Sequence, residues 1–160
     1  MSTPLRILII GRNGQVSRAL QSRLSGMGEL LVRGSDQLDL AQADSLRAPI
    51  KALRPDLIIN AAAHTAVDQA ESEPERVFAI NATAPGILAQ AAAELGIPLI
   101  HYSTDYVFDG LKPTSYTEDD TPNPLSVYGR SKLAGEDAIR QAGGQHLILR
   151  TSFPWACSIW

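Results

Sequence analysis

The sequence predicts an α/β fold in which a doubly wound parallel sheet carries helices on both faces. Short, almost wholly apolar runs, typical of strands buried on both faces, alternate with longer segments. Apolar residues in those longer segments recur at intervals of three and four, which is the helical period. Two glycines directly follow the first apolar run. Alternation of strand and helix with right-handed crossovers places ligands at the carboxyl ends of the strands.

Composition bounds the class of protein before any motif is considered. A chain of 160 residues is expected to form one domain with a core of ordinary size. With 44% hydrophobic and 19% charged residues, it does not belong to the disordered, collagen-like or disulfide-scaffold classes. Fourteen basic against seventeen acidic residues give a net charge of −3, which argues against nucleic acid as a partner.

Cysteine usage and hydropathy give the expected compartment. Cys157 is the one cysteine, so neither an intrachain disulfide nor a cysteine-rich metal site can form, and a reducing compartment fits. We expect no metal-binding residues. No apolar run reaches the ~18 residues of a membrane span, and the first four residues lead into a strand-like segment rather than a secretory signal. We therefore expect a cytoplasmic protein with no membrane partner.

Five buried strands are expected, at residues 5–10, 29–33, 56–60, 99–103 and 146–150, with a very short sixth strand at 38–40. The first strand and the glycines after it must lie where the strand order reverses. This requirement predicts the order 3-2-1-4-5-6, or the same order without the short edge strand.

Helical spacing covers residues 16–24, 46–53 and 77–95, and Gly96 and Pro98 are stop signals for the last of these segments. Pro85 has no N–H, so a helix through it leaves the Asn81 carbonyl without its usual partner and should kink there. A helix that restarts near Pro85 is the alternative. The irregular stretch 109–124 is either a substrate-side loop or an ordinary surface loop.

The turn after the first strand reads Gly11-Arg12-Asn13-Gly14-Gln15-Val16-Ser17. Two glycines let the backbone turn tightly and approach a diphosphate, while the helix N-terminus supplies free N–H groups and partial positive charge. Ser17 is small enough for close helix–strand packing. Although a plain tight turn is the structural alternative, the position after a buried strand predicts a Rossmann-type dinucleotide site.

The second strand ends at Arg33-Gly34-Ser35-Asp36, where such folds bind the adenosine ribose. Arg33 and Ser35 could hold a 2′-phosphate, whereas Asp36 could bind a 2′-hydroxyl. The pattern favours NADPH as the cofactor, with NADH as the alternative. A solvated surface charge is the other interpretation of Arg33.

Two further motifs carry chemistry. Ser103-Thr104-Asp105 ends one predicted strand, and Tyr128 and Lys132 are four residues apart on a predicted helix. This spacing puts the two side chains on one face, where an ammonium is expected to lower the pKa of the phenol. The tyrosine would then exchange protons near neutral pH. An exposed helical pair is the structural alternative.

Together these motifs resemble the extended short-chain dehydrogenase/reductases. The resemblance covers roughly residues 5–152 and rests on the Gly11 and Gly14 turn, the run 60–68 (NAAAHTAVD), the run 102–108 (YSTDYVF) and the run 128–132. Within that family it implies the branch that reduces the 4-keto group of dTDP-6-deoxy-L-lyxo-4-hexulose to dTDP-L-rhamnose. The implied partner is therefore a dTDP-sugar, and the implied cofactor is NAD(P)H.

The resemblance also implies roles for individual residues. It implies the catalytic residues Thr104, Tyr128 and Lys132. It adds cofactor contacts to Arg33 and Ser35, namely Gly11, Asn13, Gly14, Gln15, Val16, Asp39, Leu40, Ala61, Ala62, Ala63, Thr65, Tyr128 and Lys132. The sugar nucleotide would face Val67, Asp105 and Tyr106. His64 is expected to be a hydrogen-bonded structural histidine rather than a base.

Members of this family are about twice as long as the present chain. We expect residues 1–152 to form the NAD(P)-binding domain and residues 153–160, which do not continue the resemblance, to be an unmatched tail. A natural truncation, a frameshift or a cloned fragment would each give this ending. Without a substrate domain, turnover is expected to be impaired, so a non-catalytic dinucleotide-binding module is the alternative to a reductase. A homodimer is an open alternative for the assembly.

Overall fold

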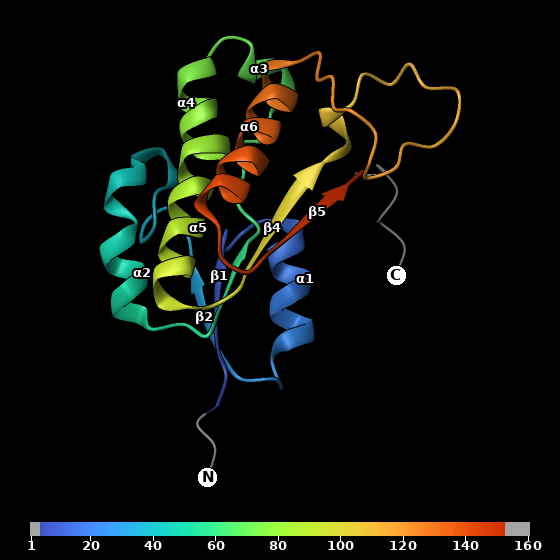
Figure 1. Cartoon of the computed structure of the whole chain (residues 1–160). Coiled ribbons are helices and arrows are strands. Elements are labelled where there is room, and N and C mark those ends of the chain that lie inside the picture. The colour runs from blue at the N-terminus through green and yellow to red at the C-terminus, as the bar shows by residue number, and fades with distance from the viewer. Residues whose placement is uncertain (1–3, 153–160) are drawn as a thin grey trace.

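A computed structural model describes residues 4–152, which form one five-stranded sheet in which all neighbouring strands are parallel (Figure 1). The strands are β1 (Arg6–Ile10), β2 (Glu29–Arg33), β3 (Leu57–Asn60), β4 (Leu99–Thr104) and β5 (His146–Thr151). Their order is β2-β1-β3-β4-β5, which is the predicted order without the short edge strand. The predicted fold class is confirmed. The proposed tail 153–160, with Cys157, lies outside the described residues.

The prediction of a short strand at 38–40 is wrong. Leu38 and Leu40 turn their side chains into the core, where both are buried. Between them, the Asp39 carboxylate accepts the Ala41 N–H at 3.0 Å and begins the 3-10 helix η1 (Leu40–Ser45). The alternation of Leu38 and Leu40 therefore reflects a turn capped by Asp39 and not a strand. The backbone of this turn is too curved to pair with β2.

Helices cover the two faces of the sheet unequally (Figure 1). The helix α1 (Gln15–Leu24) packs on one face, and the other face carries α2 (Arg47–Leu53), α5 (Ala84–Leu95) and α6 (Val127–Ala142). The shorter elements include the helices α3 (Val67–Ala70) and α4 (Pro74–Phe78) and the 3-10 helix η3 (Asp105–Val107). No helix within residues 4–152 is both long enough and apolar enough to cross a membrane.

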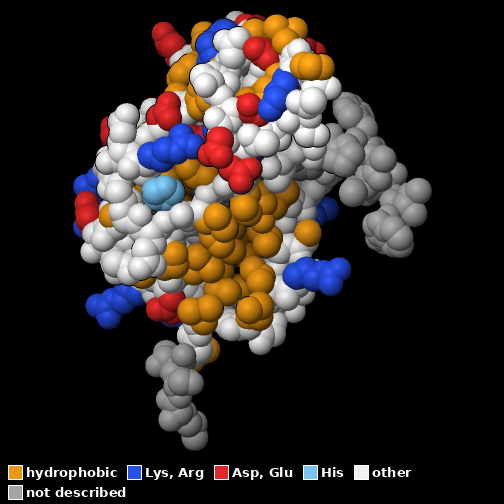
Figure 2. Space-filling model, turned by 45° about the vertical axis from the view of Figure 1, so that its right-hand side comes forward, with side chains coloured by type: hydrophobic (Ala, Val, Ile, Leu, Met, Phe, Trp, Pro, Cys, Tyr) orange, Lys and Arg blue, Asp and Glu red, His pale blue; other side chains and the backbone are white. Residues whose placement is uncertain are grey.

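The α1 face remains partly uncovered over β3, β4 and β5. Leu57, Ile100 and Tyr102 on this face are only partly buried, and Leu147 on β5 is 51% exposed. Figure 2 turns the β5 side of the molecule forward and shows a broad patch of hydrophobic side chains there. The main core, by contrast, lies between the sheet and α2, α5 and α6.

The predicted irregularity near Asn81 is present as a π-helical turn, η2 (Ala79–Thr83), between α4 and α5. The Ala84 N–H donates to the Ala79 carbonyl five residues earlier, and Pro85 follows in the first turn of α5. Because Pro85 cannot donate to Asn81, the chain widens by one residue here and the helix continues. The Asn81 carbonyl faces α6 as a result.

Helix α6 approaches this π turn and η3 through two glycines. A Cβ atom on Gly135 would lie far inside van der Waals contact of the Asn81 carbonyl oxygen. A Cβ atom on Gly129 would meet the Tyr106 carbonyl oxygen in the same way. Glycine is therefore required at both positions. Because neither residue has a side chain, α6 can lie in close contact with η2 and η3.

Substitution Gly135→Ala should destabilise the fold by about 1 to 3 kcal/mol, because backbone must move to admit the methyl group. Alanine's higher helix propensity, worth about 1 kcal/mol, is too small to reverse that effect. Urea unfolding measures the change. Gly26→Ala is the matched control, since nothing lies within 4 Å of its added Cβ atom, and it should change stability by about 0.5 kcal/mol or less. Equal stabilities of the two variants would contradict this packing.

Candidate active site

The turn between β1 and α1 forms an open cradle of backbone. Gly11 has φ +108°, and a Cβ atom there would lie 3.0 Å from the Ala62 nitrogen, so only glycine fits on both grounds. Gly14 precedes α1 in extended conformation, and no side chain caps the helix. The first N–H groups of α1 have no intrahelical partners, and its first turn holds no acidic residue. This arrangement suits an anion at Asn13, Gln15 and Val16.

The end of β2 lies beside this cradle. The Gly11 N–H donates to the Arg33 carbonyl at 2.9 Å, while the Arg33 guanidinium bonds the Val32 carbonyl. Ser35 and Asp36 are exposed in the following turn. Arg12, a residue that the sequence reasoning missed, reaches across to Asp36 with its Nη1 3.3 Å from Oδ2. The Arg12 guanidinium therefore lies beside the turn predicted to bind the ribose, where it pairs with Asp36.

Asp39 and Leu40 lie at the start of η1, beyond that turn. The Asp39 carboxylate is already used as the cap of η1, and the Leu40 side chain is buried in the core. A ligand could therefore contact the backbone of Asp39 and Leu40, but not the buried Leu40 side chain. Ala61, Ala62 and Ala63 follow β3 and are half-buried, and Thr65 is exposed beyond them.

Asn81 holds the loop after β3 against α6. Its amide oxygen accepts the His64 N–H at 2.8 Å, and its amide nitrogen donates to the His64 carbonyl and to Ser131 Oγ, both at 3.0 Å. The expectation of a hydrogen-bonded imidazole at His64 is wrong: its backbone is bonded, but its buried Nδ1 atom has no partner among the described residues. The Asn81 side chain, and not the His64 imidazole, therefore makes the hydrogen bonds that hold this loop.

Tyr128 and Lys132 lie on α6, which begins where the Ser126 hydroxyl accepts the Gly129 N–H at 3.0 Å. Both side chains are buried, so the alternative of an exposed helical pair is wrong. Burial raises the pKa of Tyr128 above its ordinary value, and the interaction of its hydroxyl with the Thr104 side chain offsets only part of that rise. The expected lowering of this pKa by Lys132 is therefore wrong in this structure.

Lys132 is 1% exposed and turns its amine toward β4. Its Nζ atom donates to the Tyr102 carbonyl at 2.6 Å and lies 3.3 Å from His101 Nε2. Burial lowers the pKa of Lys132 to about 8, against a smaller opposing effect of the Glu136 charge. The amine is thus held near its midpoint of ionisation at mildly alkaline pH.

The residues predicted for catalysis and sugar binding surround the Tyr128 ring. Thr104 ends β4, donates to Asp105 Oδ1 at 3.2 Å and accepts the Tyr106 N–H at 3.2 Å. The Tyr106 ring, which is half exposed, meets the Tyr128 ring edge-on with centroids 5.5 Å apart. Val67 packs against the cluster that includes Tyr128. The structure thus brings Thr104, Asp105, Tyr106 and Val67 to one phenol.

A buried ion cluster lies one turn beyond Lys132. Glu136 is fully buried and accepts from Ser103 Oγ at 2.6 Å, from Arg150 at 2.9 and 2.7 Å, and from Arg140 at 2.9 Å. Burial alone would raise the pKa of Glu136, but the hydrogen bonds from Arg150 and Ser103 hold this pKa below its ordinary value. The cluster joins α6 to β4 and β5 directly beneath the site.

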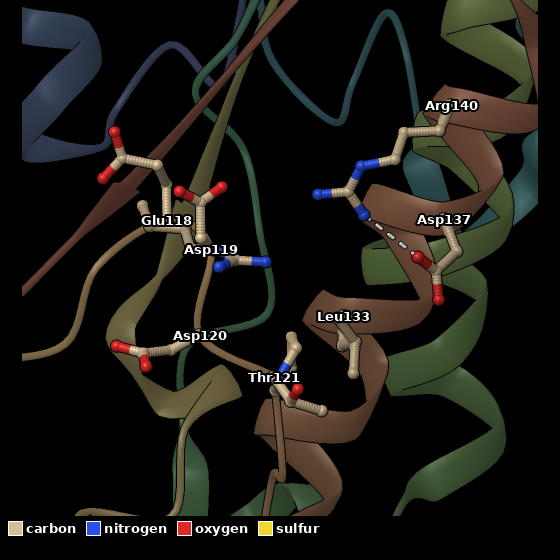
Figure 3. Close-up of a pocket in the computed structure, with 9 residues that line it drawn as sticks. Glu118, Asp119, Asp120, Thr121, Leu133, Asp137 and Arg140 are labelled. Carbon is tan, nitrogen blue, oxygen red and sulfur yellow. Dashed lines mark hydrogen bonds and ion pairs between the residues drawn. The ribbon is translucent and has the colours of Figure 1, made fainter. Parts of the chain in front are cut away.

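The loop 109–124 is ordered by its own polar contacts. Asp109 accepts from the Tyr116 hydroxyl at 2.5 Å and from Asn123 at 3.0 Å, and the hydrogen bond from Tyr116 contributes most to lowering the pKa of Asp109 to about 2. A cavity of about 410 Å³ lies between this loop and α6 (Figure 3). Its lining includes Glu118, Asp119 and Arg140 and shares no residue with the predicted site. This cavity is therefore separate from the predicted site.

Residues 4–152 contain no group of three or more histidine, cysteine or acidic side chains placed to hold a metal ion. Several site residues escaped the sequence reasoning because their contacts depend on the fold: Arg12, Asn60, His101, Ser131 and Glu136. The four-residue spacing of Lys132 and Glu136 was the one available signal for the last of these.

A family model and curated relatives place the chain in the same protein family. A family model described as "RmlD substrate binding domain" matches residues 5–157. The chain is 48% identical over 152 residues to the dTDP-4-dehydrorhamnose reductase of Sinorhizobium fredii, covering 95% of this chain and 51% of that protein. It is 46% identical over 156 residues to the Escherichia coli K12 reductase, covering 95% and 52% respectively. The chain therefore spans about half the length of the curated relatives it matches.

Solved structures agree. A dTDP-4-dehydrorhamnose reductase from Bacillus anthracis in complex with NADP superposes with a TM-score of 0.89 at 36% identity, over 94% of this chain and 54% of that one. The RMD protein of Pseudomonas aeruginosa complexed with NADPH gives a TM-score of 0.76 at 26% identity, over 92% and 54%. The described sheet is thus the fold shared by these proteins.

The buried amine of Lys132 should make stability depend on pH. The pKa of this group falls from 10.5 to about 8 on folding, so the unfolded chain binds more protons between these values and stability should rise with pH across that window. The wild type should therefore gain about 2 kcal/mol relative to Lys132→Met between pH 7.5 and 9.5 in urea unfolding. Lys51→Met, at a lysine whose side chain is 46% exposed, is the control and should show no such trend. A constant difference between wild type and Lys132→Met would contradict the burial of the amine.

Proposed function

The chain belongs to the RmlD substrate binding domain family, and on that premise we propose that it carries the NAD(P)H site and the catalytic groups of a dTDP-4-dehydrorhamnose reductase. The proposed reaction is reduction of the 4-keto group of dTDP-6-deoxy-L-lyxo-4-hexulose to dTDP-L-rhamnose. Curated relatives of that name support the assignment, as does the NADP complex of the Bacillus anthracis protein.

The convergence of the cradle and Tyr128 at one edge of the sheet is the observation that carries this proposal. Gly11 touches Ala62 across the carboxyl ends of β1 and β3. From that loop, Asn60 contacts His101 on β4 at 3.0 Å, and His101 in turn contacts Lys132 on α6 at 3.3 Å. A continuous series of contacts therefore joins the backbone cradle to the buried Lys132, which lies one helical turn after Tyr128 on α6.

The residues present fit a dinucleotide. A Cβ atom would close the cradle at Gly11, and the α1 N-terminus offers unpartnered N–H groups to a diphosphate. Small side chains at 61–63 leave the backbone accessible next to it. Arg33, Ser35 and Arg12, at or beside the turn after β2, would bind a 2′-phosphate, so we expect NADPH to be favoured over NADH. Lys132 would bind the nicotinamide ribose.

When bound, NAD(P)H would supply a hydride to the sugar carbonyl carbon. Tyr128 would give the proton to the carbonyl oxygen. Its raised pKa suits this role, because the phenol stays protonated at neutral pH while the developing alkoxide is a much stronger base. The Thr104 hydroxyl would polarise the same oxygen. Val67, Asp105 and Tyr106, gathered around Tyr128, would face the sugar nucleotide.

Cofactor choice can be tested on the chain itself. Calorimetric titration should show NADPH binding, and Arg33→Ala should weaken it roughly tenfold, which corresponds to the loss of about 1.4 kcal/mol from one phosphate contact. NADH binding should hardly change, because NADH has no 2′-phosphate. Arg23→Ala, at an exposed arginine in the last turn of α1, is the control and should bind as the wild type does. Equal losses for both cofactors would contradict a 2′-phosphate contact.

Tyr128→Phe should lower kcat for reduction of the 4-keto sugar by about 10² to 10⁴, the range typical of a lost general acid. The NADPH dissociation constant should stay within a few-fold of the wild-type value. Tyr116→Phe, which removes a hydroxyl bonded to Asp109 in the outer loop, should keep the wild-type rate. A Tyr128→Phe protein as fast as the wild type would rule out the mechanism. NADPH binding with no turnover in the wild type would leave a dinucleotide-binding module instead.

A further inference from the structure

The proton positions along Asn60, His101 and Lys132 can be assigned from one backbone group. The Ala62 N–H donates to Asn60 Oδ1 at 3.2 Å, so the other end of that amide, Nδ2, faces His101 Nδ1 at 3.0 Å. An amide nitrogen can only donate. His101 Nδ1 must therefore accept, and the proton of the neutral imidazole lies on Nε2.

That assignment has a consequence for Lys132. The Nε2–H of His101 points at Lys132 Nζ, 3.3 Å away. An ammonium has three protons and no lone pair, so it cannot accept this hydrogen bond, whereas a neutral amine can. The neutral amine also keeps a proton for the Tyr102 carbonyl at 2.6 Å. The observed arrangement thus satisfies every group when Lys132 is neutral.

Protonation of Lys132 reverses each donor in this series. The ammonium would donate to His101 Nε2, and the imidazole proton would then have to lie on Nδ1. Facing that proton, the Asn60 amide would have to present its oxygen and rotate by half a turn. The Ala62 N–H would lose its partner and become free to donate to another acceptor.

We propose that Asn60 and His101 form a relay in which the proton on Lys132 sets the tautomer of His101 and, through the Asn60 amide, decides whether the Ala62 N–H is engaged. His101 is a positioning residue in this scheme: it exchanges no proton with substrate. The effect of the relay on sugar reduction rests on the proposed function, since Ala62 would border the bound dinucleotide and Lys132 would bind the nicotinamide ribose. The relay itself needs neither ligand.

The surroundings make a change of tautomer more favourable than a change of charge at His101. The imidazole is 1% exposed, and burial, followed by the Lys132 charge, holds the pKa of His101 well below its ordinary value. The titratable groups facing Lys132 are His101 from β4, Tyr128 one turn earlier on α6 and Glu136 one turn later. Glu136 is paired with Arg140 and Arg150. Lys132 is therefore the group in this series that changes charge at mildly alkaline pH.

The test is the tautomer of His101, read by two-bond ¹H–¹⁵N correlation spectra of the histidine-labelled chain between pH 6 and 10.5, without cofactor or substrate. His101 should show the Nε2–H pattern at high pH and the Nδ1–H pattern at low pH. Loss of its signals in His101→Gln identifies them among the three histidines. His146→Gln, at an exposed histidine whose imidazole hydrogen-bonds the Gly144 carbonyl, is the control and should leave them unchanged.

Two variants should each fix one tautomer. Lys132→Met removes the ammonium, so Asn60 should hold His101 as Nε2–H at every pH. Asn60→Asp presents only oxygens, so Nδ1 should stay protonated throughout. A wild-type His101 with a single tautomer from pH 6 to 10.5, or an unchanged pH response in Lys132→Met, would overturn the relay. The wild-type titration decides the matter even where a variant fails to fold. Failure to bind NADPH would count against the proposed function and leave this result standing.

Discussion

The close docking of α6 on the carboxyl end of β4 is the constraint on which the site depends. Two glycines without side chains let the helix reach the backbone of η2 and η3, and Lys132 is buried as a result. A buried amine is costly unless its protons are partnered. The Tyr102 carbonyl and His101 provide those partners, so the same contact that lowers the pKa of Lys132 also fixes where its side chain lies.

The remaining polar residues of the interior reinforce that docking. Glu136 ties α6 to Ser103 on β4 and to Arg150 on β5, and removing one partner of such a buried pair typically costs about 3 to 5 kcal/mol. Asn81, a buried residue of the π turn beside α6, ties the loop after β3 to Ser131. The irregular helix is thus part of the site's construction. Its widened turn follows from the missing N–H of Pro85.

Much of the fold could be predicted from periodicity because the parallel strands are buried on both faces and read as apolar runs. The strand at 38–40 failed for a physical reason: Leu38 and Leu40 alternate like a strand, but Asp39 caps a 3-10 helix between them. Tyr128 and Lys132 were predicted from their spacing, which a helix enforces. Spacing carries no information on burial, so the direction of the Tyr128 pKa shift was predicted wrongly. Arg12, His101 and Asn60 act across different strands, and no local pattern marks such contacts.

We propose that the cradle after β1, the loop after β3 and the Tyr128–Lys132 pair form one dinucleotide site along the carboxyl edge of the sheet. A crystal structure of the chain grown with NADPH would locate the cofactor. We expect the diphosphate at the amides of Asn13, Gly14 and Gln15 and the nicotinamide ribose within hydrogen-bonding distance of Lys132. A dinucleotide bound elsewhere, for example in the cavity between α6 and the loop 109–124, would contradict it.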